Sequence, residues 1–345
     1  MYRSKLLPRI GLGLGLLSLS LPLLAAPSFG ADREHSLNVR LSWLTSGYQA
    51  AFYLAAAKGW YAKAGLDVSL TPGTGSVTTI QLVGSQQYDA GEAALSSMVF
   101  ARVKGMAITS IAGFFRTGDV SLMVPVESSI KGPADLKGKK IIYTAGSFEG
   151  PFLDSFLQAG GIKRDEVEFV NMEPNSRNSV YGSGGVDAMF GSPVGSLIVV
   201  NRLRKSRAIL FADYGLSLPG FGIVASLATL KDKGPAMRAF ATAVSAAWAY
   251  IENGHEEEGV QAILQARPND RVDAEEIRQQ LHNSSPFLVS KTTPGLPIGV
   301  QSEADWKETI ATMEKAKVIE GGSKPADFFT NDYLDVNLIK SLGSS

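Results

Sequence analysis

The chain has 345 residues, 45% of them hydrophobic, which is enough to bury a sizeable core and to form roughly two domains. Its 33 basic and 33 acidic residues balance and no basic cluster is present, so we expect no nucleic-acid partner. The lack of cysteine excludes a structural disulfide, a thiolate zinc site and a catalytic thiol.

The first expected element is a signal peptide at residues 1–31. Three basic residues among the first nine precede an apolar run that is interrupted by Pro22 and ends in small residues. This order is typical of a cleavable secretory signal, and the run is short for a membrane span, which needs about 20 residues. We therefore expect cleavage after Gly30 or Ala31 and a protein located in the periplasm. A retained membrane anchor is the alternative interpretation.

Strand and helix patterns alternate over the next part of the chain, up to residue 120. Strand-like runs are followed by segments with apolar residues at helical spacing, and Gly65 is a typical helix end. The expected strands are 38–44, 66–70, 88–93 and 106–115, and the expected helices are 49–65, 76–86 and 94–105. This alternation predicts an open, mostly parallel α/β sheet.

The segment from residue 121 to residue 220 repeats this plan. The expected strands are 139–146, 166–172, 186–191 and 207–212, and the expected helices are 149–161, 175–184 and 192–203. The loop TPGTGS, residues 71–76, corresponds to EPNSRN, residues 173–178, and each follows a strand and precedes a helix. We interpret the two halves as a pseudo-repeat that shares architecture only.

After residue 220 the sequence predicts one more strand and then a helical tail. The strand is 221–226, and the helices are 235–254, 256–267, 274–283 and 302–318. This order indicates that the chain leaves lobe 1, builds lobe 2 and returns, with crossings at 117–125 and 217–226. We predict that lobe 1 consists of residues 37–120 and 221–345 and that lobe 2 consists of residues 121–220.

The loops that follow the strands hold the candidate binding residues. In open α/β sheets the ligand crevice lies at the carboxyl ends of the strands. Here these loops are rich in glycine, serine and threonine, and their aromatic candidates for stacking are Trp43, Tyr48, Phe115 and Phe148. Two facing lobes would offer rings and hydrogen-bond donors to a small polar molecule. Core packing is the alternative role of each aromatic residue.

The charged candidates for ligand contact are Glu92, Arg116, Glu149, Glu173 and Arg177. Glu92 follows a strand and Glu149 begins a helix, where an acid is also favoured by the helix dipole alone. Arg116 lies at the first crossing, and it either binds an anion or forms a hinge salt bridge with Asp119.

Motifs for catalysis or for phosphate binding are incomplete. The loop TPGTGSVTTI, residues 71–80, lacks both the Lys-Ser/Thr of a phosphate loop and the full GxGxxG of a dinucleotide fold. We interpret it as one lip around a small molecule, or as a tight turn without a ligand role. No HExxH or GxSxG pattern is present, and His255 and His282 lie in the helical tail. We therefore expect no enzyme activity, no metal site and no cofactor.

Several of these segments resemble a known family. The run AAAKGWYAKAGLDV, residues 55–68, the segments DLKGKKI, residues 135–141, and AGSFEGPFLDSFLQAGGI, residues 145–162, are similar to periplasmic binding proteins of the NMT1/THI5-like family. Its members serve ABC importers for sulfonates, nitrate and thiamine-pyrimidine precursors. The resemblance covers residues 37–320 and implies a type II-like fold of two hinged lobes.

The resemblance also implies a function and a set of contacts. The protein would be a monomer that binds a small-molecule solute and presents it to a membrane permease with a cytoplasmic ATPase. The family's contacts would fall on Trp43, Gln49, Gly75, Ser76, Glu92, Ser96, Gly146, Ser147, Phe148 and Glu149. Trp43 fits the aromatic residue on which members stack a pyrimidine.

Two other functions remain open, namely an enzyme of pyrimidine or thiamine-precursor metabolism and a periplasmic ligand-binding sensor. The family's pyrimidine-synthesising enzymes use an internal histidine and a cysteine-rich iron segment, and this chain has neither. A solute-binding protein is therefore our leading hypothesis. The loop chemistry favours a heterocycle, an aromatic acid or a sulfonate as its solute.

Overall fold

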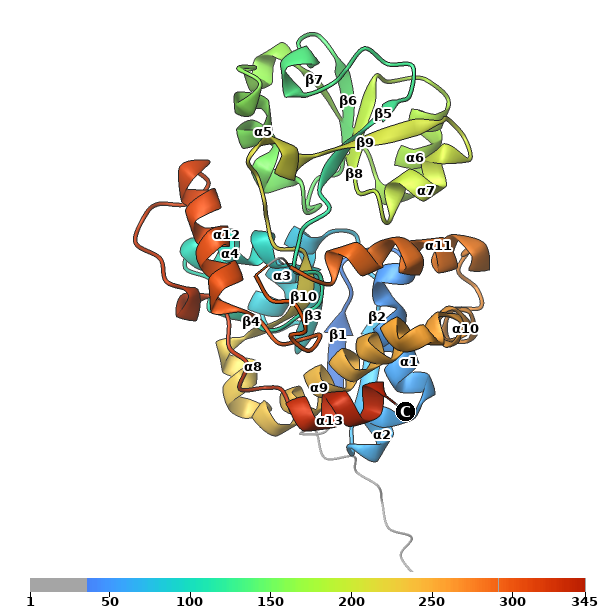
Figure 1. Cartoon of the computed structure of the whole chain (residues 1–345), viewed down its shortest axis with the longest axis vertical. Helices are drawn as coiled ribbons and strands as arrows, with labels where there is room; N and C mark the ends of the chain where they lie inside the picture. Colours follow the sequence, from blue (N-terminus) through green and yellow to red (C-terminus); the bar gives the residue numbers. More distant parts are fainter. Residues whose placement is uncertain (1–35, 291, 345) are drawn as a thin grey trace, which may run out of the picture. The chain divides into compact units, whose positions relative to one another are not determined.

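The computed structural model describes residues 36–290 and 292–344, and strands within these residues form two five-stranded sheets (Figure 1). The first sheet has the order β2 (Asp67–Thr71), β1 (Ser36–Arg40), β3 (Ala90–Ala94), β10 (Phe221–Ser226) and β4 (Ile108–Gly113). The second sheet has the order β7 (Glu168–Asn171), β6 (Lys140–Tyr143), β8 (Ala188–Gly191), β5 (Ser121–Pro125) and β9 (Ser206–Leu210). The expected signal peptide lies outside the described residues. None of the helices within those residues combines the length and the apolar character that crossing a membrane requires.

The two sheets share one plan. In the first sheet β1 pairs in parallel with β2 and β3, and β10 runs antiparallel between β3 and β4. In the second sheet β6 pairs in parallel with β7 and β8, and β5 runs antiparallel between β8 and β9. Each sheet therefore has four strands in one direction and one in the other, which confirms the predicted α/β class with mostly parallel sheets.

The strands divide between the sheets in the order expected for two lobes. Those of the first sheet come from residues 36–113 and 221–226, and those of the second come from residues 121–210. The proposed lobe boundaries at residues 120 and 220 fall between these two sets of strands and stay a prediction. The expected crossing at 117–125 contains a strand, β5, because its residues pair with both β8 and β9.

Helices follow most of the strands. Near the first sheet they are α1 (Ala50–Ala57), α2 (Trp60–Lys63), α3 (Ser76–Gly84), α4 (Leu95–Val103), α8 (Leu227–Asp232) and α9 (Gly234–Tyr250). The second sheet carries α5 (Leu153–Ala159), α6 (Pro174–Gly182) and α7 (Ser196–Asn201). The tail has α10 (Glu256–Ala266), α11 (Ala274–Ser284), α12 (Glu303–Lys315) and α13 (Val336–Gly343). The single helix expected at 49–65 is two helices, because Gly59 has a left-handed φ of 67° between them.

The apolar core continues from one sheet to the other. One cluster contains Val99 and Ile108 of the first sheet's layer together with Leu122 and Phe156 of the second. Within it the rings of Phe156 and Phe211 stack at 4.0 Å. Val120 and Leu218 of the two crossings belong to the same cluster, so the crossings are packed against apolar side chains and are not bare linkers.

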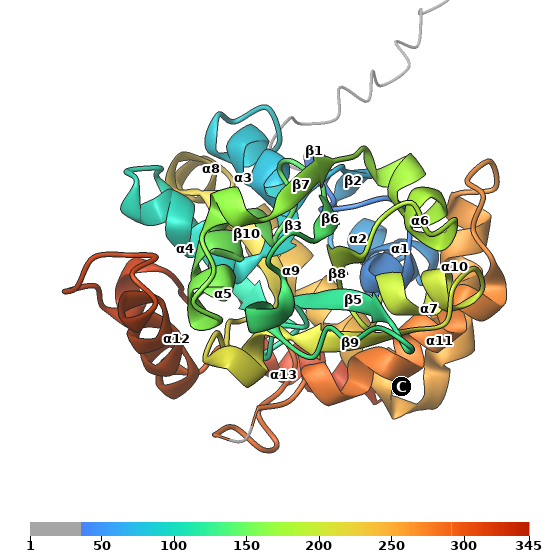
Figure 2. The same ribbon diagram turned by 90° about the horizontal axis from the view of Figure 1, so that it is seen from above.

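The helical tail contacts both sheets' layers. Figures 1 and 2 show α5 on the side of α4 and α12, and α6 and α7 on the side of α10 and α11. The Ser155 hydroxyl of α5 donates to the Ala316 carbonyl after α12 at 3.2 Å. The Gln280 amide of α11 donates to the Gly195 carbonyl beside α7 at 3.4 Å. The tail thus packs against lobe 2 as well as lobe 1.

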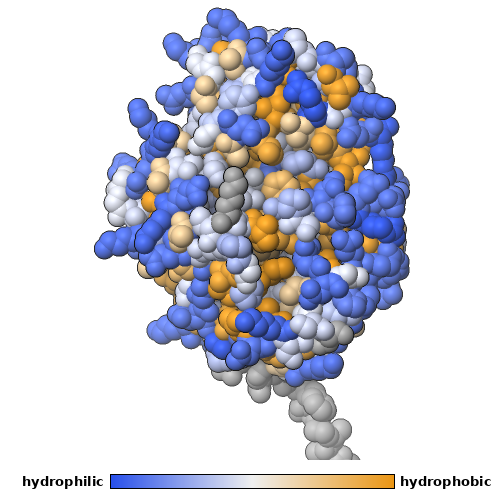
Figure 3. All heavy atoms as spheres, in the orientation of Figure 1, coloured by the Kyte–Doolittle hydropathy of each residue, from blue (hydrophilic) through white to orange (hydrophobic). Residues whose placement is uncertain are grey.

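The surface carries no single large apolar patch on the face drawn in Figure 3, where hydrophobic residues are interspersed with hydrophilic ones. Large apolar side chains that are more than half exposed include Val126, Leu203 and Val289. These residues belong to separate segments, after β5, after α7 and after α11.

The loops after β2 and β6 touch through their backbones. The Val77 N–H donates to the Gly146 carbonyl at 2.9 Å. A Cβ atom on Gly75 would lie only 2.2 Å from that carbonyl oxygen, so this approach requires a glycine. The contact joins the first lobe to the second.

We predict that Gly75→Ala destabilises the protein by roughly 1–3 kcal/mol, because the added methyl group forces the two loops apart. Chemical denaturation measures this change. The matched control is Gly150→Ala in the neighbouring loop, since a Cβ there meets no atom within 4 Å. Equal stability of the two variants would show that the loops do not need their close contact.

Candidate functional site

A cavity of about 530 Å³ lies among the loops of both sheets and the tail. Its wall comes from residues within 42–48 after β1, Pro72, Ser76, Phe148, residues within 174–178 at the start of α6, residues within 191–199 after β8, Phe221, and residues within 267–280 of the tail. Because β1, β2, β7 and β8 end just before these segments, the cavity lies at the carboxyl ends of parallel strands.

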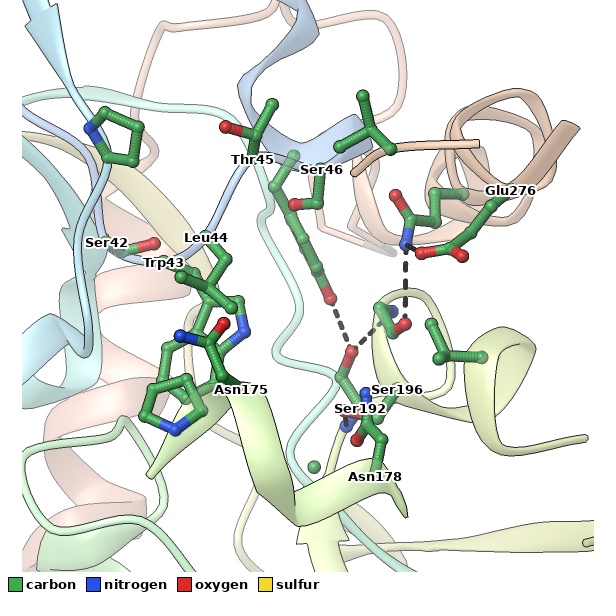
Figure 4. Close-up of a pocket in the computed structure, with 18 of the residues that line it drawn as sticks. Ser42, Trp43, Leu44, Thr45, Ser46, Asn175, Asn178, Ser192, Ser196 and Glu276 are labelled. Atoms are coloured by element: carbon green, nitrogen blue, oxygen red, sulfur yellow. Dashed lines mark hydrogen bonds between the residues drawn. The ribbon is translucent and has the colours of Figure 1, made fainter. Parts of the chain in front are cut away.

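Five of the candidate contacts line this cavity, namely Trp43, Tyr48, Ser76, Phe148 and Arg177. Figure 4 shows the half-buried Trp43 within the loop that follows β1. The ring of Phe148 lies 5.7 Å from the ring of Phe221, edge to face. These aromatic side chains give the cavity an apolar surface, and their contact with a solute stays a prediction.

Two predicted contacts of lobe 1 are buried behind the cavity wall. The Glu92 Oε2 atom accepts a hydrogen bond from the Ser42 N–H at 2.8 Å, and the Gln49 Oε1 atom accepts one from the Ser46 N–H at 2.9 Å. Ser42 and Ser46 line the cavity, whereas Glu92 and Gln49 do not. The structure therefore gives these two side chains the role of fixing the loop after β1.

The remaining predicted contacts near the loops also lie outside the wall. They are Gly75, Ser96, Gly146, Ser147 and Glu149. The Ser147 hydroxyl donates to the Glu149 carboxylate, and the Thr144 N–H donates to the same carboxylate at 3.5 Å. These contacts shape the loop that presents Phe148.

Phe115 and Arg116 lie apart from the cavity. Phe115 packs in the core, with its ring 5.1 Å from Tyr48 and 5.7 Å from Trp248. Arg116 donates to the carbonyls of Leu296 and Pro297 at 2.7 and 2.8 Å. The expected salt bridge between Arg116 and Asp119 is wrong, because Arg116 holds the loop before α12 and Asp119 accepts a hydrogen bond from Tyr48.

Besides Arg177, a charged candidate of the sequence, the structure adds lining residues that the sequence alone did not single out. Figure 4 labels Asn175, Asn178, Ser192, Ser196 and Glu276 in the wall, and Arg177 lies there too. The correspondence of EPNSRN with TPGTGS was the available signal for Asn175, Arg177 and Asn178. No local signal marked the tail residues, because α11 reaches the cavity by long-range packing: the Gly47 N–H donates to the Gln280 Oε1 atom at 2.7 Å.

Tyr48 connects three segments through its hydroxyl. It donates to the Asp119 carboxylate at the first crossing, and its oxygen lies 2.7 Å from the Ser192 hydroxyl after β8. Burial raises the pKa of the Asp119 carboxyl to about 6 and holds the pKa of the Tyr48 hydroxyl well above its ordinary value. The Tyr48 hydroxyl thereby connects residues of lobe 1, of the first crossing and of lobe 2.

The histidines of the tail are not part of the cavity wall. The His255 ring stacks on Tyr250 at 3.7 Å, and His282 lies on α11. Among the residues in the ranges 36–290 and 292–344, no group of three or more histidine, aspartate or glutamate side chains is placed to hold a metal ion.

Glu92 gives the site a testable pH dependence. Burial raises the pKa of its carboxyl to about 7, so in the folded protein it holds a proton that the unfolded chain has already released near pH 5. The free energy of unfolding therefore falls as the pH rises from 4.5 to about 7, by about 3 kcal/mol at most. The buried Asp119 carboxyl, whose pKa is raised to about 6, also lowers the stability as the pH rises, over a lower range of pH.

We predict that Glu92→Gln flattens this fall, because the amide stays neutral and its oxygen still accepts from the Ser42 N–H. Denaturant unfolding at about pH 5 and about pH 7.5 gives the difference for each variant. Glu173→Gln, which changes an exposed glutamate, is the control. An unchanged pH slope in the Glu92 variant would contradict the assignment.

Two relatives in sequence cover most of the chain. A Haemophilus influenzae protein named for thiamine biosynthesis is 26% identical over 272 residues, 78% of this chain and 84% of that protein. The formylaminopyrimidine-binding protein of Halalkalibacterium halodurans is 23% identical over 300 residues, 86% of this chain and 90% of that protein.

A solved structure supports the fold. The alkanesulfonate-binding protein SsuA of Xanthomonas axonopodis pv. citri, bound to MOPS, matches with a TM-score of 0.65 at 15% identity, and the match covers 86% of this chain and 98% of that one. Two sheets on one plan and this likeness establish a periplasmic-binding-protein fold. Residues 46–258 match the family model described as NMT1/THI5 like, and the chain therefore belongs to the NMT1/THI5-like family.

Proposed function

We propose that the protein is the periplasmic solute-binding component of an ABC importer and that it has no catalytic activity of its own. The observation that carries this proposal is a cavity of about 530 Å³ whose wall is built by loops of both sheets. A molecule held there contacts both lobes at once. The names of the Halalkalibacterium halodurans relative and of the solved neighbour, which describe binding of small molecules, support it.

The mechanism we propose is a shift between open and closed arrangements of the lobes. A solute that touches Trp43 and Ser76 on one lobe and Asn178 and Ser192 on the other makes more contacts when the lobes are together. Such a solute favours the closed arrangement by the free energy of these extra contacts. The closed form is then the one presented to the permease.

Several lobe contacts are independent of the solute. Tyr48 bonds to Ser192, and the Val77 N–H bonds to the Gly146 carbonyl. These bonds lower the free energy that the solute must supply for closure, because part of the interface is satisfied by the protein itself.

The size and chemistry of the cavity favour an organic solute. Sites for small organic molecules typically measure about 300–1,000 Å³, and the cavity of about 530 Å³ falls in this range. Its aromatic side chains and its serine and asparagine side chains together suit a ring with polar substituents. We therefore propose a heterocycle, an aromatic acid or a sulfonate.

The direct test is capture of a solute from small-molecule extracts of the source organism. The purified protein is unfolded, refolded, incubated with the extract and examined by native mass spectrometry, and we expect one bound molecule per chain. At about 100 times its dissociation constant, that molecule adds roughly 2.7 kcal/mol of stability. If none of the extracts yields a molecule that binds to the protein or stabilises it, the proposal is contradicted.

Import is separated from sensing by a transport measurement. Deletion of the gene should abolish uptake of the labelled solute. If uptake persists while a transcriptional response to the solute is lost, the protein is a sensor.

We predict that Trp43→Ala weakens solute binding by about tenfold or more, because it removes a large stacking surface from the cavity. Calorimetric titration measures the affinity, and thermal unfolding of the free protein should change little because Trp43 is half-buried. Trp43→Phe, which keeps a ring, is the matched control and should retain most of the affinity. Unchanged affinity in the alanine variant would remove Trp43 from the site.

A further inference from the structure

One side chain of the cavity wall has unused hydrogen-bonding capacity. Arg177 is only 4% exposed, and its Nη2 atom has no hydrogen-bond partner among the residues that the structure describes. Its Nη1 atom donates to the Thr144 hydroxyl at 3.0 Å, and its Nε atom lies 3.5 Å from the Met189 sulfur, a weak acceptor. A buried guanidinium with an unsatisfied donor is costly unless something binds it.

The nearest acid does not complete this group. The Glu149 Oε1 atom lies 3.8 Å from the Arg177 Nη1 atom, beyond hydrogen-bond distance. That carboxylate already accepts hydrogen bonds from Ser147 and Thr144. Burial lowers the pKa of Arg177, but a guanidinium stays protonated in proteins, so the positive charge remains at the wall.

Arg177 lies in the first turns of α6, which begins at the cavity. Pro174, Asn175 and Asn178 of the same helix line the wall beside it. The N-terminus of a helix carries a partial positive charge that favours an anion. At the start of α6 the Ser176 and Arg177 N–H groups donate to the Glu173 carbonyl at 3.1 and 3.3 Å and Pro174 has no N–H, so the Asn175 N–H is the donor that this turn offers to a ligand. No side chain caps this end of α6, since its N-cap residue Glu173 makes no capping hydrogen bond.

The negative charges of the opposite wall do not oppose an anion at this place. Asp270 is bonded to Arg267 at 2.9 Å, and Glu276 lies 3.7 Å from Arg202. Asp270 is thus paired with an arginine of the tail, and Glu276 is paired with an arginine of lobe 2.

An aromatic surface lies directly next to the charge. The Arg177 guanidinium carbon is 5.7 Å from the centre of the Trp43 ring, within the range of a cation–π contact across the cavity. A planar solute that stacks on Trp43 therefore brings its substituents within reach of Arg177 and of the α6 N-terminus.

From this geometry we propose that the solute is an aromatic ring bearing an oxyanion, a carboxylate or a sulfonate, and that Arg177 and the first turn of α6 bind the anionic group while Trp43 stacks on the ring. This inference rests on the proposed solute-binding function and narrows its solute class. Arg177 is the residue that makes the site select an anion over a neutral molecule of the same shape.

The test compares isosteres on the unaltered protein. Benzoate is titrated against benzamide, and benzenesulfonate against benzenesulfonamide, with quenching of tryptophan fluorescence and calorimetry as readouts. We expect the better anion to bind roughly 30-fold more tightly than its neutral partner, as for a buried charge pair. The carboxylate and sulfonate arms show which oxyanion the site prefers.

Variants of Arg177 then locate the selectivity. Arg177→Lys keeps the charge but loses the planar fork, and Arg177→Gln combined with Glu149→Gln removes both buried charges so that neither remains unpaired. We expect both variants to lose most of the preference for the anion, the double variant more completely. Arg164→Gln, which changes an exposed arginine of the same lobe, is the control and should keep the preference.

Each outcome decides the proposal. Equal affinity for the anion and its neutral isostere, or an unchanged preference in the Arg177 variants, overturns it. If none of the four compounds binds, the solute captured from the extract decides: an aromatic oxyanion supports the proposal, whereas a neutral or aliphatic molecule overturns it and leaves the solute-binding function intact. If neither the compounds nor the extract yields a ligand, both proposals fail.

Discussion

The cavity depends on one geometric constraint, namely that parallel strands joined through helices all end at the same edge of their sheet. In the first sheet this edge collects the loops after β1 and β2, and in the second it collects those after β7 and β8. Since the chain passes between the sheets twice, near residues 120 and 220, the two edges come together. Seven short segments, each unable to enclose a molecule, thereby form one wall.

Much of this arrangement follows from local patterns. Apolar periodicity and glycine stops locate nearly all strands and the helices next to them, and the correspondence of TPGTGS with EPNSRN predicts that two loops have equivalent places. The antiparallel strand β5 escapes such reasoning, because nothing within Ser121–Pro125 distinguishes a strand from an extended crossing until β8 and β9 pair with it. The two short helices α8 and α13 were missed for a similar reason, since a stretch of six or eight residues shows too few turns for a clear period.

The candidate site was harder to predict than the fold, because side-chain roles depend on distant partners. Arg116 was a reasonable anion ligand by position, yet its guanidinium bonds to carbonyls about 180 residues later in the chain. Glu92 and Gln49 lie one layer behind the wall and act on it through the N–H groups of Ser42 and Ser46. Sequence patterns place residues on a loop, but they do not tell which side chain turns towards the cavity and which towards the core.

The repeated loops also illustrate how one backbone design can carry two different roles. At the start of α3 the Val77 N–H donates to the Gly146 carbonyl, and Gly75 allows that close approach. This helix start therefore joins the two lobes. At α6 the corresponding loop has no such glycine, and it carries Asn175, Arg177 and Asn178 towards the cavity instead. Because a helix N-terminus attracts either a carbonyl oxygen or an anion, the same feature can hold a carbonyl in the first lobe and, in our proposal, an anionic solute in the second. The divergence of TPGTGS from EPNSRN then has a physical reason: small residues are required where two backbones meet, and polar side chains suit the place where we propose that a solute is held.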